Sequence, residues 1–161
     1  MSKALWLGIY IGSIVLANLC TTQFGLVPIG FGLLVTAGTF AAGFALIARD
    51  AVQVKSGKAI VLLAIVIGAG ISALTSNPAI AIASGIAFLI SELVDFAVFT
   101  PLKGRNLAGA VVASSVISAP VDTVLFLHLA GFGVTWQAVL GQFIVKTALA
   151  LIAAIVITAR R

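Results

Sequence analysis

The sequence has very few charged residues. Only 8% of its 161 residues are Asp, Glu, Lys or Arg, whereas 62% are hydrophobic. A soluble domain carries roughly 25% charged residues, so the composition excludes an ordinary soluble enzyme or binding domain. The chain has one cysteine, Cys20, which excludes a disulfide framework and a metal site built from cysteines. The composition instead predicts an integral membrane protein.

Acidic residues are fewer than basic residues. Nine Lys and Arg face four Asp and Glu, which gives a formal net charge of +5. In a soluble protein this excess would suggest a nucleic-acid partner. Here the basic residues lie in short segments beside apolar runs, which is the pattern of a topology signal, so no nucleic-acid partner is expected.

Six apolar runs are each long enough to cross a hydrocarbon core of about 30 Å. They occupy residues 4–23, 31–48, 59–75, 79–100, 107–130 and 136–158. We therefore predict an all-α polytopic membrane protein, in which residues 1–161 form a single six-helix transmembrane domain. The first run is predicted to be a membrane helix and not a cleaved signal peptide, because no small-residue cleavage site leads from it into a soluble domain.

The basic residues recur at every second connection. Lys3 precedes the first run, Arg49, Lys55 and Lys58 follow the second, Lys103 and Arg105 follow the fourth, and Arg160 and Arg161 follow the sixth. The positive-inside rule then predicts that both termini are cytoplasmic. Only Lys146, in the middle of the sixth run, is not explained by this topology.

Two carboxylates interrupt the apolar segment Ile90–Phe99. Glu92 and Asp95 are three residues apart, so they share one face of a helix. An ionised carboxylate in hydrocarbon costs at least about 2.5 kcal/mol, and such a residue is a functional candidate by default. This face is therefore expected to contact protein, water or a partner charge.

Glu92 and Lys146 are predicted to lie near the midplane of the membrane, with Asp95 about 8 Å toward the cytoplasm. Asn18 and Asp122 are predicted to lie about 6 Å toward the outside. Asn18, Ser114, Asp122 and Lys146 are all placed within the apolar runs. One interpretation is structural: Lys146 neutralises Asp122 or Glu92, and the remaining carboxylates reach the interface near the basic residues that follow the fourth run. The other is a ligand site, because embedded acids then outnumber embedded bases by three to one.

Three segments carry a resemblance to a known family. They are ASGIAFLISELVDFAVFTPLKGRN from Ala83, ASSVISAPVDTVLFLHLAGF from Ala113 and FIVKTALA from Phe143. Together they resemble the second half of the vitamin-uptake-transporter-like (VUT) family of queuosine precursor transporters. The family pattern corresponds to Ser84, Glu92, Asp95, Val98, Phe99, Asp122, Thr123, Phe126 and Lys146. In the first half, Ala17-Asn18 and Asp50 with Gly57 resemble family positions as well.

The resemblance implies a function and a substrate. It implies a six-helix protein of the bacterial cytoplasmic (inner) membrane that takes up 7-cyano-7-deazaguanine or a related 7-deazaguanine. The family often has an asparagine and a basic residue where this chain has Ala119 and Ala79, which leaves the exact 7-deazaguanine open.

The chemistry of such a substrate fits the polar inventory. A carboxylate of Glu92 or Asp122 can accept the adjacent N1–H and 2-amino donors, Lys146 or Asn18 can donate to the carbonyl, and phenylalanines can flank the ring. The predicted substrate-binding residues are Asn18, Ser84, Phe88, Glu92, Asp95, Ser114, Asp122, Phe126 and Lys146.

Two alternatives to a self-contained transporter stay open. One is a substrate-binding membrane subunit of an energy-coupling (ECF-type) vitamin or nucleobase importer, which would need an energising ATPase partner. The other, an intramembrane enzyme, is disfavoured because the sequence lacks a nucleophile–base pair or a metal cluster. No cofactor or metal is expected. The expected partners are a purine-like small molecule and the lipid bilayer, with a second copy of the chain or an energising partner left open.

Overall fold

A computed structural model describes residues 2–159 of the chain, with side chains described as far as Ile155. These residues form six helices and one antiparallel hairpin. In chain order the elements are α1 (Lys3–Phe24), β1 (Leu26–Gly30), β2 (Leu33–Thr36), α2 (Thr39–Ser56), α3 (Lys58–Thr75), α4 (Pro78–Leu102), α5 (Leu107–Leu129) and α6 (Trp136–Ala159).

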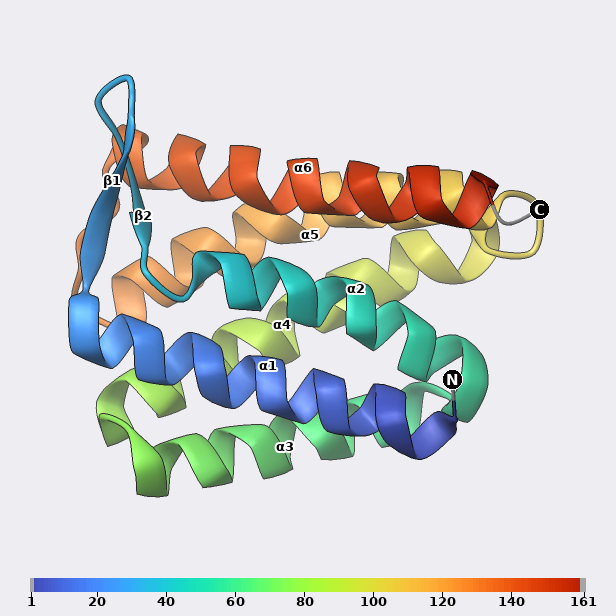
Figure 1. Cartoon of the computed structure of the whole chain (residues 1–161), viewed down its shortest axis with the longest axis horizontal. Helices are drawn as coiled ribbons and strands as arrows, with labels where there is room; N and C mark the ends of the chain where they lie inside the picture. Colours follow the sequence, from blue (N-terminus) through green and yellow to red (C-terminus); the bar gives the residue numbers. More distant parts are fainter. Residues whose placement is uncertain (1, 160–161) are drawn as a thin grey trace.

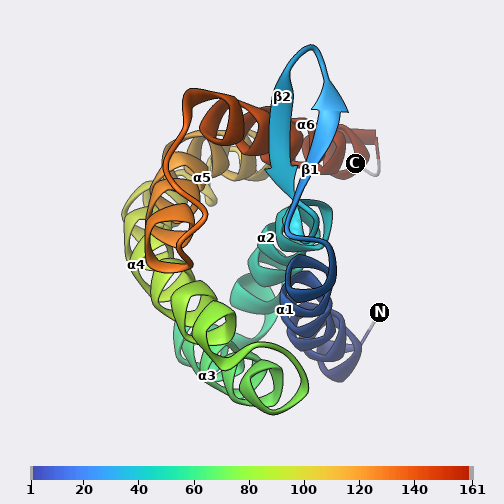
Figure 2. The ribbon, with the colours of Figure 1, turned by 90° about the vertical axis from the view of Figure 1, so that its left-hand side faces the viewer.

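The helices lie side by side along the long axis of the molecule (Figure 1). Seen along that axis, they form a ring around the interior (Figure 2). The packed neighbours follow the order α1, α2, α6, α5, α4 and α3, and α3 closes the ring against α1. Every helix contributes buried residues to the interior.

The two ends of the bundle differ in charge. The start of α1, the end of α6 and the α2–α3 and α4–α5 connections lie at one end (Figure 1). We call it the basic end, because Lys3, Lys55, Lys58, Lys103 and Arg105 are placed there. Arg160 and Arg161 belong to the same predicted pattern but lie outside the described residues. The opposite end carries the hairpin, and we call it the hairpin end.

Five helices are long and apolar enough to cross a membrane: α1, α3, α4, α5 and α6 over Trp136–Ile155. Their outward surfaces keep apolar side chains exposed, such as Leu16, Val66, Leu93 and Ile144, which suits contact with lipid. Buried side chains that include Tyr10 and Phe88 fill the interior. The chain is therefore a helical membrane protein, which confirms the predicted class.

The second helix differs from its predicted range. Instead of spanning residues 31–48, it begins at Thr39 and ends at Ser56, and residues 26–36 form the hairpin. Hydropathy alone does not separate an apolar hairpin from an apolar helix. The separating signal is local: Gly30, Phe31 and Gly32 all have positive φ angles at the tip, a conformation that glycine adopts without steric cost. The other five helices begin and end within two residues of the predicted ranges.

The hairpin packs against the bundle at one close contact. A β-carbon at Gly141 of α6 would lie 2.2 Å from the backbone oxygen of Leu34 in β2. Only glycine allows this approach, so Gly141 fixes the hairpin over the start of α6.

We expect the basic end to face the cytoplasm. In a Cys20→Ser background, cysteines placed at Asn77 and Gly133 of the hairpin end should react with a membrane-impermeant maleimide in intact cells. Cysteines at Ser56 and Gly104 of the basic end should react only after the membrane is permeabilised. Labelling of the basic-end positions in intact cells would reverse the orientation.

Candidate functional site

A small cavity lies in the half of the bundle nearer the hairpin end. It is lined by Ala17, Asn18, Thr21, Thr36, Gly38, Ala42, Ser84, Phe88, Asp122, Phe126, Gln142 and Lys146. The centre of a water molecule can occupy about 20 Å³ of it, which is room for about one water. The cavity is therefore closed to anything larger in this conformation.

A buried ion pair forms one wall of the cavity. Lys146 Nζ of α6 donates hydrogen bonds to Asp122 Oδ2 at 2.7 Å and to Thr123 Oγ1 at 2.8 Å, both on α5. All three residues are at least 95% buried. The expectation that Lys146 pairs with Asp122 or Glu92 is thus resolved in favour of Asp122.

Gln142 lies one helical turn before Lys146 and lines the same cavity. Its side chain is 1% exposed, and its Nε2 has no hydrogen-bond partner within the described chain. A buried amide donor without a partner costs free energy. Gln142 therefore presents an unused donor to the cavity, and its four-residue spacing from Lys146 is the sequence signal that could have included it among the predicted site residues.

One side of the cavity is formed where the start of α2 packs closely on α1. A β-carbon at Gly38 would lie 2.0 Å from the backbone oxygen of Ala17. The Gly38 N–H also donates to Thr21 Oγ1 at 3.2 Å. The start of α2 is therefore held against the end of α1. Across the cavity, Phe88 and Phe126 supply aromatic rings from α4 and α5.

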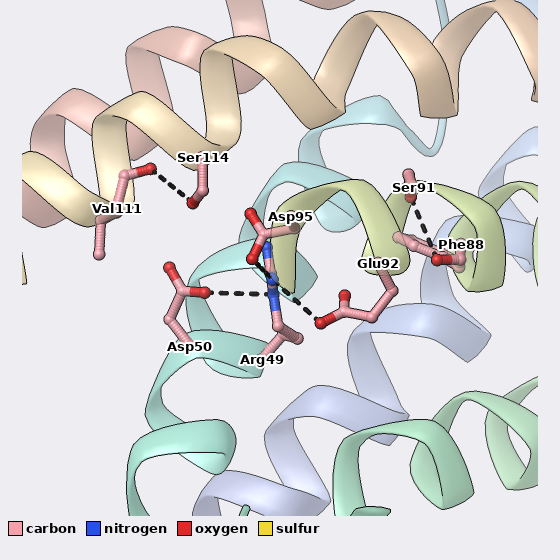
Figure 3. A network of polar contacts seen from close by, with 8 residues as sticks. All are labelled: Arg49, Asp50, Phe88, Ser91, Glu92, Asp95, Val111 and Ser114. Carbon is pink, nitrogen blue, oxygen red and sulfur yellow. Dashed lines mark hydrogen bonds and ion pairs between the residues drawn. The ribbon is translucent and has the colours of Figure 1, made fainter. Parts of the chain in front are cut away.

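A second polar network joins α2 to α4 (Figure 3). We call Arg49, Asp50, Glu92 and Asp95 the Arg49 cluster. Arg49 Nη1 donates to Glu92 Oε1 at 3.0 Å and to Asp95 Oδ2. Its Nε lies 3.1 Å from Asp50 Oδ1 as an ion pair, although the two groups are not aligned as a hydrogen bond. All four side chains are buried.

This cluster corrects two sequence-based interpretations. Arg49 was assigned to a basic loop, but it lies inside α2 and is 0% exposed. Lys146 is therefore not the only buried cation. Glu92 and Asp95 do not reach the interface near Lys103 and Arg105, because Arg49 holds them inside the bundle.

The predicted substrate-binding residues fall into two groups. Those that line the cavity are Asn18, Ser84, Phe88, Asp122, Phe126 and Lys146. The other three have different surroundings: Glu92 and Asp95 bind Arg49, and the Ser114 hydroxyl donates to the backbone oxygen of Val111 at 3.3 Å. Their role in substrate binding stays a prediction.

A bundle of apolar helices around a polar, charged cavity fits a membrane transport protein. The family model described as "Putative vitamin uptake transporter" matches residues 72–159, more than half of the chain. The chain belongs to this family. The matched region contains all of α4, α5 and α6, and thus Glu92, Asp95, Asp122 and Lys146. No curated protein and no solved structure matches the chain.

Proposed function

We propose that this transporter imports a queuosine precursor, 7-cyano-7-deazaguanine or a related 7-deazaguanine, across the bacterial inner membrane. The observation that carries the proposal is the grouping of Asp122, Lys146 and Gln142 around one buried cavity. A carboxylate, a cation and an amide in one place match the donor and acceptor edges of a deazaguanine. The catalytic alternative has no such support.

Each cavity group has a complementary atom on the substrate. The Asp122 carboxylate accepts from the adjacent N1–H and 2-amino groups. Lys146 or Gln142 donates to the ring carbonyl, and Phe88 and Phe126 contact the faces of the ring. Charge-assisted pairs of this kind are roughly twice as strong as neutral ones.

Binding requires the cavity to widen, since it has room for about one water molecule. The Lys146–Asp122 pair is the contact that a substrate would disturb, because the substrate's donors compete with Lys146 for the carboxylate. We infer that substrate takes over part of Asp122 and thereby loosens α6 from α5.

We also propose that α2 is the sixth span. It carries Arg49 and Asp50, but both are directed to the interior, so its polar side does not meet lipid. With six spans, both ends of the chain lie on the same side, and the basic end faces the cytoplasm.

Affinity measurements on the purified protein test the substrate assignment. We expect Gln142→Leu, which leaves the Lys146–Asp122 pair intact, and Asp122→Asn each to weaken binding of 7-cyano-7-deazaguanine by about tenfold or more, since a hydrogen bond to a charged or buried group contributes about 1.5 kcal/mol or more. The matched control is Ser118→Ala, one turn before Asp122 on α5 and also buried.

Equal affinities for the parent protein and both cavity variants would contradict the assignment. Uptake by the protein alone in liposomes would support a self-contained transporter. Binding without uptake would favour the energy-coupled importer, in which a partner ATPase drives the substrate across.

A further inference from the structure

The Arg49 cluster joins two helices that are not neighbours in the ring. Arg49 and Asp50 belong to α2, whereas Glu92 and Asp95 belong to α4 (Figure 3). Within the described residues, α2 packs chiefly on α1, α6 and α3, and α4 packs on α5 and α3. The cluster is therefore a charged connection across the interior.

This connection lies directly beside the cavity. On α4, Phe88 lines the cavity, and Glu92 follows one turn later, about 6 Å along the axis. On α2, Ala42 lines the cavity, and Arg49 follows about 10 Å toward the basic end. The cluster thus lies between the cavity and the basic end.

The charges of the cluster do not balance. Three carboxylates surround one guanidinium, which gives a formal charge of −2 when all are ionised. Arg49 and Asp95 are 0% exposed, Glu92 is 2% exposed and Asp50 is 5% exposed. Buried charges are costly unless they are paired, so a bound proton on one carboxylate would remove half of the imbalance.

Asp50 is the carboxylate with the weakest support. Neither of its oxygens takes part in a hydrogen bond within the described chain, whereas Glu92 and Asp95 each accept one from Arg49. A buried amide without partners lies close to Asp50 in the sequence. Gln53, one turn after Arg49, has no hydrogen-bond partner for its side chain among the described residues.

Tyr10 provides a polar group from a third helix. This residue of α1 is 1% exposed, and its hydroxyl has no hydrogen-bond partner among the described residues. Tyr10 therefore adds a buried, unpartnered hydroxyl to the interior of the bundle.

Further titratable groups face this region from the remaining helices. They are Asp122 of α5 with its partner Lys146 of α6, Lys58 of α3, whose Nζ is 4.8 Å from the centre of the Phe96 ring, and Lys103 after α4, whose Nζ is 6.0 Å from the centre of the Phe99 ring.

We propose that the Arg49 cluster is a proton-binding site, separate from the cavity, that couples transport to a proton gradient. One proton forms an O–H bond with a carboxylate oxygen of Asp50, and the formal charge of the cluster changes from −2 to −1. The guanidinium occupies the centre of the cluster, so a metal cation would meet a like charge there. This inference rests on the transport role but not on the identity of the substrate.

The protonation state of Asp50 determines how strongly the cluster holds α2 to α4. When Asp50 is neutral, Arg49 is shared only between Glu92 and Asp95, and the connection closes the basic end. When Asp50 is ionised, it competes for Arg49 and repels the carboxylates of α4. Release of the proton at the basic end therefore opens that end, as import driven by an acidic exterior requires.

Infrared spectroscopy of the protein in membranes tests the proton site without any substrate. We expect the parent protein to show the C=O stretch of a protonated carboxyl group at neutral pH, with a shift in D2O. Asp50→Asn should remove this band. Lys55→Met, which removes an exposed charge near the end of α2, and Asp122→Asn should both retain it.

Uptake of 7-cyano-7-deazaguanine into liposomes tests the coupling. An acidic exterior should drive accumulation by the parent and by Lys55→Met, while Asp50→Asn should fall to the level of protein-free liposomes and still bind the compound. If the infrared band is present but the parent does not bind this compound, the substrate proposal fails and the proton site stands. If no protonated carboxyl depends on Asp50, or if Asp50→Asn still accumulates the compound with the gradient, the proton site is overturned.

Discussion

Replacing Arg49 with methionine is expected to destabilise the protein by about 3–5 kcal/mol, the usual cost of removing one partner from a buried ion pair. The effect should be at the upper end of this range, because Glu92 and Asp95 would both lose the cation that pairs with them inside the bundle. Methionine keeps most of the side-chain length, so the loss reflects charge and hydrogen bonding more than packing. Thermal unfolding of the detergent-solubilised protein measures it.

Two further variants test whether the loss of stability comes from the charge of Arg49. Lys55→Met removes an exposed positive charge from the same helix and should leave the unfolding midpoint almost unchanged. Adding Asp95→Asn to Arg49→Met should recover part of the stability, because one of the unpaired charges is removed. An unfolding midpoint for Arg49→Met equal to that of Lys55→Met would show that Arg49 does not neutralise the cluster.

Five helices of this fold were predictable because each is a long, predominantly apolar run. The side chains of Asn77 and Asn106 accept hydrogen bonds from the backbone N–H groups at the starts of α4 and α5. Residues 26–56 were the exception. There the apolar residues form a hairpin. The helix that follows contains Arg49 and Lys55, which the hydropathy pattern predicts to come after its end. Hydropathy alone therefore predicts a helix where the hairpin lies and a loop where the end of α2 lies.

The two buried ion networks also differ in how far the sequence could predict them. Lys146 lies inside a long apolar run, so its burial and its need for a partner could be inferred, and Asp122 was one of two candidates. Arg49 follows an apolar run and precedes two lysines, which is also the pattern of a cytoplasmic loop. Only the position of α2 shows that its side chain points inward, and no local signal in the sequence pairs it with α4.

The second large effect on stability and uptake is expected when the Lys146–Asp122 pair is broken. Lys146→Met keeps the length of the side chain but leaves Asp122 buried and without its cation, so we expect a loss of stability of about 3 kcal/mol. It should also abolish uptake, because Lys146 both fixes the carboxylate and contributes a donor to the cavity. Asp122→Asn alone should destabilise the protein for the converse reason, since it leaves the ammonium unpaired.

The double variant separates stability from transport. Combining Lys146→Met with Asp122→Asn removes both charges, so the protein should regain much of the stability that each single change costs, while uptake stays absent. The coupling is read from the thermal unfolding of the parent, the two single variants and the double variant as a cycle. Glu92→Gln combined with Lys146→Met is the matched comparison, and its losses should add, because Glu92 is bound by Arg49. Additive losses for the Asp122 combination as well would mean that Lys146 is not paired with Asp122 in solution, and the model in which substrate loosens α6 by competing for that carboxylate would then be wrong.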